Sequence, residues 1–319
     1  LMIMSAAQVA YVVLWAYAAN RLYFKLFPSR RMIMIYGSQA ATRLIYKMSK
    51  RYDKYLICAV VSSSESFENI IERIAPYEAV VLCDVRAEMR NQILKYCYGH
   101  SIRVYMTPNI TDIIIGGADK LHLFDTPLYL CRNNGLAPDQ RMLKRAMDLL
   151  ISIPAVPLLS PLMLGIALAI KIEDGGPVFF RQKRLTRGGR EFLICKFRSM
   201  RVNAEEDGVA RLATRHDDRI TRVGSFLRRT RLDELPQLLN VIRGEMSIIG
   251  PRPERPEIAR QYEETMPEFN YRLRVKAGLT GYAQILGKYN TIPHDKLKLD
   301  LLYIERYSLL LDLKILLMT

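Results

Sequence analysis

A long apolar segment broken by prolines limits the folds open to this chain more than any other feature. Residues 146–170 are about as long as a membrane-spanning helix, but three prolines inside them each remove a backbone donor and bend a helix. Basic residues flank the segment on both sides, so the positive-inside rule places both of its ends in the cytoplasm. A helix that spans the membrane cannot meet this condition. The prolines are Pro154, Pro157 and Pro161, and the flanking residues are Lys144, Arg145, Lys171, Arg181, Lys183 and Arg184.

A re-entrant hairpin meets the conditions set by both the prolines and the charges. Such a segment enters one leaflet and bends back, here near Ser160 and Pro161, where a serine hydroxyl can partner a backbone group that a proline frees. A kinked spanning helix and a buried helix of a soluble protein are the alternatives. We expect re-entry over residues 146–170.

The first 19 residues form a second apolar segment of a different kind. Their only polar side chains are Ser5, Gln8 and two tyrosines, and a helix of this length can cross about 30 Å of hydrocarbon. Basic residues begin at Arg21, which places the following chain in the cytoplasm. A buried core helix and a signal peptide are the alternatives, but no small-residue cleavage site follows. We predict a transmembrane helix within residues 1–27, and expect more membrane sequence before it because the chain begins on Leu1 rather than Met.

Residues 28–130 alternate short apolar strands with helical patterns. This alternation predicts a parallel, doubly wound sheet, an architecture in which dinucleotides bind. The first turn begins at Gly37 and lacks the G-x-G-x-x-G sequence that lets the backbone approach a pyrophosphate. We therefore predict a degenerate Rossmann-like domain for assembly or regulation, with a working cofactor site as the alternative. It is the candidate homodimer surface, and residues 131–143 are expected to link it to the rest of the chain.

The net charge of the chain calls for a polyanionic partner. The formal charge is +15, and residues 181–231 hold fifteen Lys or Arg against six Asp or Glu, a local net charge of +9. This basic region lacks a helix-turn-helix, RRM or KH signature and a series of aromatic stacking platforms, which argues against nucleic acid. It suits a phosphorylated substrate or anionic membrane lipid. The scattered cysteines and histidines indicate neither a zinc site nor a His-based triad.

An acidic pair, Asp233 and Glu234, follows the basic region. Pro236 is tolerable only in the first turn of the helix that the next apolar residues predict, so the pair should lie at or just before the helix N-terminus. There the helix dipole favours an ionised carboxylate. Ordinary helix capping would also explain the pair. The sharper hypothesis makes one carboxylate a nucleophile toward phosphorus and the other a metal or proton partner.

Two glycine-containing turns further along are candidates for holding phosphate or nucleotide. Residues 250–253 read Gly-Pro-Arg-Pro, in which two residues of fixed φ hold Arg252, and a planar guanidinium on a stiff loop suits a phosphate. Residues 276–284 offer glycine-lined backbone, the cation Lys276 and the polar side chains of Thr280 and Gln284. Plain turns are the alternative for both segments.

Taken together, these segments resemble the bacterial sugar transferase family, the monotopic phosphoglycosyl transferases that start capsule, exopolysaccharide and O-antigen assembly. The resemblance covers residues 144–319, more than half of the chain, and rests on six elements in the family's order. One departure is that Lys276-Ala277-Gly278 stands where many members have Arg-Pro-Gly. The six elements are Lys144-Arg145 with Ser160-Pro161, Gly176-Pro177-Val178-Phe179-Phe180-Arg181-Gln182, Lys196-Phe197-Arg198-Ser199-Met200, Asp233-Glu234-Leu235-Pro236-Gln237, Gly250-Pro251-Arg252-Pro253 and Gly278-Leu279-Thr280-Gly281.

The resemblance implies a membrane protein of the α/β class. Long members of the family carry several transmembrane helices and a Rossmann-like domain before a mainly helical α+β catalytic domain, here residues 144–319 with the re-entrant helix hairpin. Residues 1–27 would then be the last of those transmembrane helices. The implied location is the bacterial inner (cytoplasmic) membrane, with the catalytic domain on its cytoplasmic face.

The resemblance also implies the chemistry. Asp233 would attack the sugar-bearing phosphate of a UDP-sugar, expel UMP and form a phosphosugar-aspartate, which undecaprenyl phosphate, a polyprenyl phosphate, then attacks while Glu234 assists. Mg²⁺ is expected at Asp233 and Glu234 because the reacting groups are all anionic and repel one another. The implied substrate contacts are Lys196, Arg198, Arg231, Gln237, Arg252, Lys276, Thr280 and Gln284.

Two other classes of protein would fit parts of the sequence. A non-catalytic membrane scaffold or nucleotide sensor would use the middle domain for a nucleotide and the basic region for lipid. A nucleotide-sugar dehydratase or epimerase would need the glycine fingerprint that the turn at Gly37 lacks. Release of UMP separates the enzyme from the scaffold, and no residue identifies the sugar.

Overall fold

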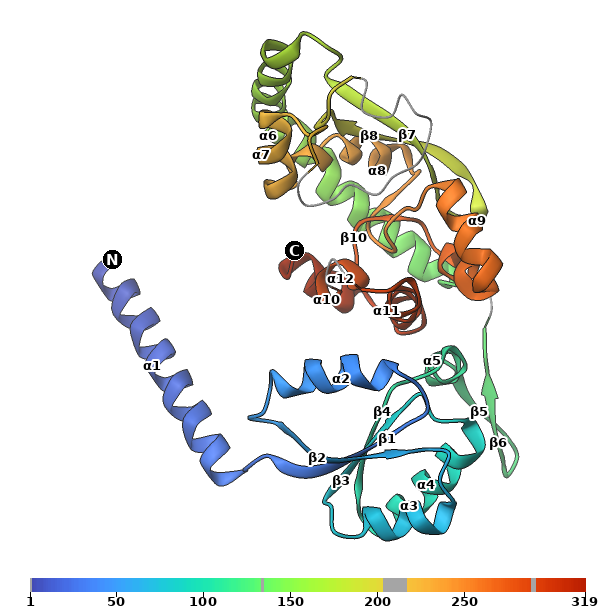
Figure 1. Ribbon diagram of the computed structural model, residues 1–319. Helices are drawn as coiled ribbons and strands as arrows, with labels where there is room; N and C mark the ends of the chain where they lie inside the picture. Colours follow the sequence, from blue (N-terminus) through green and yellow to red (C-terminus); the bar gives the residue numbers. More distant parts are fainter. Residues whose placement is uncertain (1, 133–134, 203–216, 288–290) are drawn as a thin grey trace. The chain divides into compact units, whose positions relative to one another are not determined.

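The structure is a computed structural model that describes residues 2–132, 135–202, 217–287 and 291–319. It contains two compact units, Leu1–Asn109 and Ile110–Thr319 (Figure 1). The first unit holds the N-terminal helix and a parallel sheet, and the second holds the proline-containing helix and the acidic pair.

The N-terminal segment is a single helix, α1 (Met2–Leu26), as the apolar run predicts. Its 25 residues correspond to about 37 Å at 1.5 Å per residue, which exceeds the hydrocarbon thickness of a membrane. Large apolar side chains along the helix are exposed, among them Leu14, Trp15 and Leu22. Apolar side chains that are exposed around the helix, rather than along one face of it, suit a lipid environment. That α1 crosses a membrane stays a prediction.

The remainder of the first unit alternates strands and helices: β1 (Arg30–Tyr36), α2 (Ala40–Ser49), β2 (Tyr55–Ser62), α3 (Phe67–Ile74), β3 (Ala79–Cys83), α4 (Ala87–Gly99) and β4 (Arg103–Met106). The four strands form one parallel sheet in the order β2-β1-β3-β4. Helix α2 covers one face, and α3 and α4 cover the other, each face with its own apolar cluster (Figure 1). The parallel sheet predicted from the alternation is confirmed.

The turn after β1 owes its glycine to packing. A Cβ on Gly37 would lie 2.1 Å from the carbonyl oxygen of Asp84, because the chain after β3 passes close to the end of β1. Only a residue without a side chain fits there. This contact accounts for the glycine without a cofactor, and the Rossmann-like character of the unit stays a prediction.

The boundary between the two units lies earlier than the sequence suggests. We expected the middle domain to reach residue 130, but α5 (Ile110–Gly116) belongs to the second unit, where Ile113 shares an apolar cluster with Leu297 and Leu301 of α11 (Pro293–Glu305). An antiparallel hairpin of β5 (Asp119–Leu123) and β6 (Thr126–Leu130) follows. The expected linker, residues 131–143, ends in helix, because α6 begins at Pro138.

The proline-containing segment lies within one long helix, α6 (Pro138–Asp174), which Figure 1 shows bent along its length. It is long and apolar enough to cross a membrane, and few side chains of its apolar part are buried. Pro161 has no N–H to donate to the carbonyl of Pro157, and the hydroxyl of Ser160 donates to that carbonyl instead, at 2.7 Å. The serine partner expected for a freed backbone group is therefore present. Re-entry into a membrane stays a prediction.

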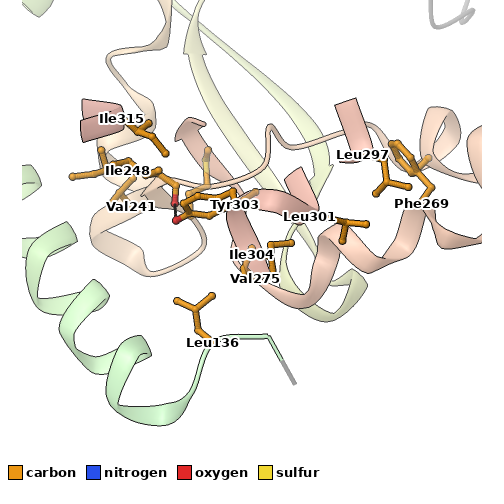
Figure 2. Close-up of a cluster of buried hydrophobic side chains, with 14 of the residues drawn as sticks. Leu136, Val241, Ile248, Phe269, Val275, Leu297, Leu301, Tyr303, Ile304 and Ile315 are labelled. Carbon is orange, nitrogen blue, oxygen red and sulfur yellow. Dashed lines mark hydrogen bonds between the residues drawn. The ribbon is translucent and has the colours of Figure 1, made fainter. Parts of the chain in front are cut away.

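The rest of the second unit consists of short elements: β7 (Phe179–Leu185), η1 (Arg187–Gly189), β8 (Glu191–Phe197), α7 (Arg222–Thr230), η2 (Leu232–Glu234), α8 (Gln237–Arg243), β9 (Ser247–Ile249), α9 (Pro256–Thr265), η3 (Pro267–Arg274), β10 (Gly278–Thr280), α10 (Tyr282–Leu286) and α12 (Leu309–Leu317). Strands β7 and β8 form an antiparallel hairpin, while β9 and β10 pair in parallel. Residues from most of these elements bury one apolar cluster around Tyr303 (Figure 2). The mixed α/β content matches the predicted fold class.

A buried polar network joins α6 to the C-terminal helix. Lys144 donates to the carboxylate of Asp312 at 2.7 Å, and the hydroxyl of Tyr303 donates to the same carboxylate at 2.8 Å. Both charged side chains are buried, at 8% and 0% exposure. One turn further along α6, Asp148 accepts from the backbone N–H of Ile248 at 3.0 Å. The first half of α6 is thereby attached to β9 and α12.

Removal of the buried cation tests this network. Lys144→Ala should lower the free energy of unfolding by about 3–5 kcal/mol, because Asp312 would keep a buried charge without its partner. Lys183→Ala is the matched control, since Lys183 pairs with Glu191 and both side chains are exposed, at 66% and 42%. The control should cost less than about 1 kcal/mol. Thermal unfolding in detergent measures both, and equal losses in the two variants would contradict the assignment.

Candidate functional site

The acidic pair lies in the 3-10 turn η2, between α7 and α8. Arg231 ends α7 in the left-handed conformation, with a φ of 58°, and turns the chain into η2. Pro236 occupies the N-cap of α8, so the pair precedes that helix as predicted. Asp233 is 9% exposed, and within the described ranges its carboxylate accepts no hydrogen bond. A buried carboxylate with free oxygens is available to a ligand.

Glu234 is held by two cations from other parts of the unit. One of its oxygens, Oε1, accepts from Nζ of Lys196 at 2.8 Å and from Nη2 of Arg252 at 2.9 Å. Lys196 comes from the end of β8, and Arg252 from the loop after β9. The structure thus brings together four predicted site residues, Asp233, Glu234, Lys196 and Arg252, from three separate segments.

The two carboxylates differ in their electrostatic setting. Burial opposes ionisation of Glu234, but Arg252 and Lys196 outweigh it and hold its pKa at about 2. Burial raises the pKa of Asp233, with Lys196 opposing the rise and Glu234 adding to it. The helix-dipole argument therefore left out the larger effect, since Asp233 sits in a buried turn before α8 begins. Burial also lowers the pKa of Lys196, as does its neighbour Arg252.

The loop that carries Arg252 is held by backbone packing. A Cβ on Gly278 would lie 2.1 Å from the backbone N of Gly250, and a Cβ on Gly281 would lie 2.1 Å from its carbonyl oxygen. The guanidinium of Arg272 also donates to the carbonyl of Arg252 at 2.9 Å. Gly278 of β10 and Gly281 just after it, which the sequence suggested as part of a nucleotide site, are thus required for a different reason. They let β10 approach the Gly250 turn closely enough to support the Arg252 loop.

Arg228 is a further cation near Asp233 that sequence reasoning did not single out. It lies on α7 and favours the ionised form of Asp233. Its Nη1 is buried without a hydrogen-bond partner among the described residues. The sequence offered only a run of three arginines in four positions, Arg228 to Arg231, and nothing in the run distinguishes its first member.

The remaining predicted substrate contacts have other surroundings. Arg198 forms an ion pair with Asp174 and donates its Nε to the carbonyl of Pro177 at 2.6 Å. The hydroxyls of Thr280 and Thr319 pair at 3.1 Å. Neither contact involves the acidic pair.

The four other predicted contacts differ in their surroundings. Burial, followed by the charge of Arg145, lowers the pKa of Lys276. Gln237 lies in the first turn of α8 at 2% exposure, and the amide nitrogens of Gln237 and Gln284 are buried without a partner in the described chain. Arg231 is exposed. Arg231 and Gln237 flank the acidic pair in sequence, Arg231 as the N-cap of η2 and Gln237 in the first turn of α8.

Comparison with known proteins identifies the family of the second unit. The family model described as bacterial sugar transferase matches residues 139–319. The chain is 40% identical over 248 residues to the UDP-N-acetylgalactosamine-undecaprenyl-phosphate N-acetylgalactosaminephosphotransferase of Aeromonas hydrophila, covering 75% of this chain and 57% of that protein. It is 40% identical over 235 residues to the UDP-glucose:undecaprenyl-phosphate glucose-1-phosphate transferase of Xanthomonas campestris pv. campestris, covering 72% and 49%.

A third relative agrees with the first two. The UDP-glucose:undecaprenyl-phosphate glucose-1-phosphate transferase of Escherichia coli (strain K12) is 42% identical over 210 residues, which cover 64% of this chain and 43% of that protein. The chain spans about half the length of the curated relatives that it matches. The resemblance inferred from six short elements is confirmed, and the chain belongs to the bacterial sugar transferase family.

Proposed function

We propose that the protein transfers a sugar 1-phosphate from a UDP-sugar to undecaprenyl phosphate, giving a polyprenyl diphosphate sugar and UMP. The names of the three relatives describe this type of reaction. These relatives differ in the sugar, N-acetylgalactosamine or glucose, so the sugar used by this chain is left open. The observation that carries the proposal is the buried Asp233 beside a glutamate that holds two cations.

Asp233 is suited to attack phosphorus. Its carboxylate accepts no hydrogen bond within the described chain, and burial raises its pKa, so it is more basic than a solvated carboxylate. In the first step an Asp233 oxygen bonds to the sugar-bearing phosphorus while the bond from that phosphorus to the bridging oxygen breaks. UMP leaves with the bridging oxygen. In the second step an oxygen of undecaprenyl phosphate bonds to the same phosphorus, and the bond between that phosphorus and the Asp233 oxygen breaks.

Glu234 is suited to positioning the cations Lys196 and Arg252 rather than to acting as a general acid. A carboxylate with a pKa of about 2 stays ionised near neutral pH and has no proton to donate. Its ion pairs hold Lys196 and Arg252, and both cations act electrostatically on Asp233. Their remaining N–H donors would be available to a diphosphate bound at Asp233. Cations there oppose the repulsion between an anionic nucleophile and an anionic substrate.

Asp233 and Glu234 are also the carboxylates that would hold Mg²⁺. Proteins commonly bind this ion through one or two carboxylates together with substrate phosphates, and the free oxygens of Asp233 suit that pattern. The described chain has no cluster of three or more His, Cys, Asp or Glu for a metal, so the diphosphate would complete the ligand set. When bound, the ion would neutralise charge on the phosphoryl oxygens.

The bent α6 suits a reaction with a membrane-bound acceptor. We propose that it re-enters the cytoplasmic side of the bacterial inner membrane as a hairpin around Ser160 and Pro161. A helix in this position would bring the acidic pair to the level of the lipid phosphate, because Ile166 of α6 packs in one apolar cluster with Leu227 of α7 and Leu232 of η2. The basic region that follows would attract the polyprenyl phosphate and the anionic lipids around it.

Replacement of Asp233 tests the nucleophile. Asp233→Asn should lower UMP release from a UDP-sugar by at least about a thousandfold, because an amide cannot form the phosphosugar intermediate. Membrane association should be unchanged, since the variant leaves α1 and α6 intact. The assay mixes the full chain with UDP-sugars, Mg²⁺ and undecaprenyl phosphate. Turnover near that of the unaltered protein would overturn the assignment.

Removal of divalent metal tests the cofactor. Treatment with EDTA should abolish UMP release, and added Mg²⁺ should restore it, because the substrate and nucleophile are both anionic. A thermal melt of the same samples should show little change, since the described carboxylates form no closed metal cage. Undiminished turnover in EDTA would contradict the metal's role.

Reporter fusions test the re-entrant hairpin. A reporter joined after Ile172 should report a cytoplasmic location, as should one joined before Lys144, because both flanks of the segment are basic. A periplasmic signal after Ile172 would mean that α6 spans the membrane.

A further inference from the structure

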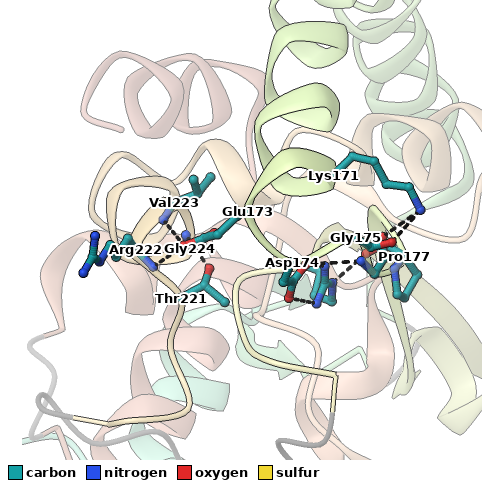
Figure 3. Close-up of polar contacts among 11 residues, drawn as sticks. Lys171, Glu173, Asp174, Gly175, Pro177, Thr221, Arg222, Val223 and Gly224 are labelled. Atoms are coloured by element: carbon teal, nitrogen blue, oxygen red, sulfur yellow. Dashed lines mark hydrogen bonds and ion pairs between the residues drawn. The ribbon is translucent and has the colours of Figure 1, made fainter.

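Two adjacent acidic residues at the end of α6 face different parts of the second unit. Glu173 and Asp174 are the last two residues before Gly175, which ends the helix in the left-handed conformation with a φ of 70°. Figure 3 shows their contacts. Neither residue was a candidate for the site on sequence grounds. Both contact segments that lead to the acidic pair.

Glu173 caps helix α7. Its Oε1 accepts from the backbone N–H of Arg222 at 2.7 Å and from that of Val223 at 3.2 Å (Figure 3). The first N–H groups of a helix have no partner within it, so these bonds attach the start of α7 to the end of α6. The hydroxyl of Thr221 accepts from the N–H of Gly224 at 2.9 Å and completes the cap.

Helix α7 connects the end that Glu173 caps to the turn that contains Asp233. Leu227, at 1% exposure, packs in the same apolar cluster as Ile166 of α6. A Cβ on Gly224 would lie 2.1 Å from the carbonyl oxygen of Ser199, so the helix lies tightly against the chain after β8. Its nine residues end at the turn that holds Asp233. A shift at the start of a short, packed helix therefore reaches the acidic pair.

Asp174 holds the other segment. It forms an ion pair with Arg198, whose guanidinium also donates to the carbonyl of Pro177 at 2.6 Å. Arg198 is 6% exposed, so this planar group is enclosed by its partners. Two residues earlier, Lys196 contacts Glu234. The start of α7 is thus attached to Glu173, and the chain at the end of β8 is attached to the adjacent Asp174.

We propose that Glu173 and Asp174 are positioning residues, which fix the positions of Asp233 and Lys196 relative to the end of α6. The inference rests on the proposed function, since it assigns a consequence for phosphosugar transfer. A displacement of about 1 Å in a reacting group can cost a hundredfold in rate. By the same geometry, Arg198 acts on the reaction through Lys196 and does not contact the substrate.

The first experiment separates the length of the side chain at position 173 from its charge. Glu173→Gln keeps the length of the side chain and an acceptor oxygen. Glu173→Asp keeps the charge, but its side chain is one methylene shorter and the carboxylate no longer reaches the N–H groups of α7. Glu173→Asp should lower kcat for UMP release about tenfold with KM for the UDP-sugar within about twofold, and Glu173→Gln should keep at least about half of kcat. Glu264→Asp, at an exposed position of α9, is the matched control. The opposite order of the two Glu173 variants would overturn the proposal.

The second experiment separates positioning from substrate contact at Arg198. Arg198→Lys keeps the charge but cannot pair with Asp174 through two nitrogens while also reaching the carbonyl of Pro177. Its kcat should fall about tenfold with KM nearly unchanged. A raised KM with normal kcat would assign Arg198 to the substrate and overturn this part of the proposal.

A third measurement does not depend on activity. Hydrogen exchange of the full chain in detergent should show faster exchange at Arg222 and Val223 in Glu173→Ala, by at least about tenfold, and unchanged exchange in Glu264→Ala. Exchange rates equal to those of the unaltered protein would show that Glu173 does not hold the start of α7 and would overturn the proposal. If the unaltered protein releases no UMP, the proposed function is overturned, and the exchange measurement still decides whether Glu173 holds α7.

Discussion

The carboxylate of Glu234 is the contact on which the candidate site depends. It accepts from Lys196 of β8 and from Arg252 of the loop after β9, so a single oxygen joins three segments that are distant in sequence. Without it, two cations would face each other in a partly buried space. With it, they surround Asp233 and leave that residue's own carboxylate free. The two carboxylates thus have different roles: Glu234 holds the two cations, and Asp233 is available to react.

The surrounding fold holds this arrangement through close backbone packing and polar contacts. Gly278 of β10 and Gly281 just after it let the backbone approach the Gly250 turn and so support Arg252. The end of α6 attaches to α7 and to Arg198, which directly follows β8. At its other end, α6 is held by the buried pair of Lys144 and Asp312. A helix proposed to enter the membrane is therefore tied at both ends to the unit that carries the chemistry.

Several of these features could be predicted from sequence because they are local. Apolar length predicted α1 and α6, strand alternation predicted the parallel sheet, and Pro236 placed the acidic pair just before α8. The serine that satisfies the Pro157 carbonyl was also expected, since it depends on neighbours in the same turn.

Other features depend on contacts between distant parts of the chain, which no periodicity reveals. The ion pair between Lys196 and Glu234, the cap that Glu173 provides and the raised pKa of Asp233 all arise from tertiary packing. The same holds for the end of the first unit at Asn109. The central claim, that Asp233 becomes covalently phosphorylated by the sugar phosphate, is tested most directly by mass spectrometry of the full chain mixed with UDP-sugars and Mg²⁺ without lipid acceptor. The account predicts one added sugar phosphate on the peptide containing Asp233, which undecaprenyl phosphate then removes, whereas an adduct on another residue would contradict it.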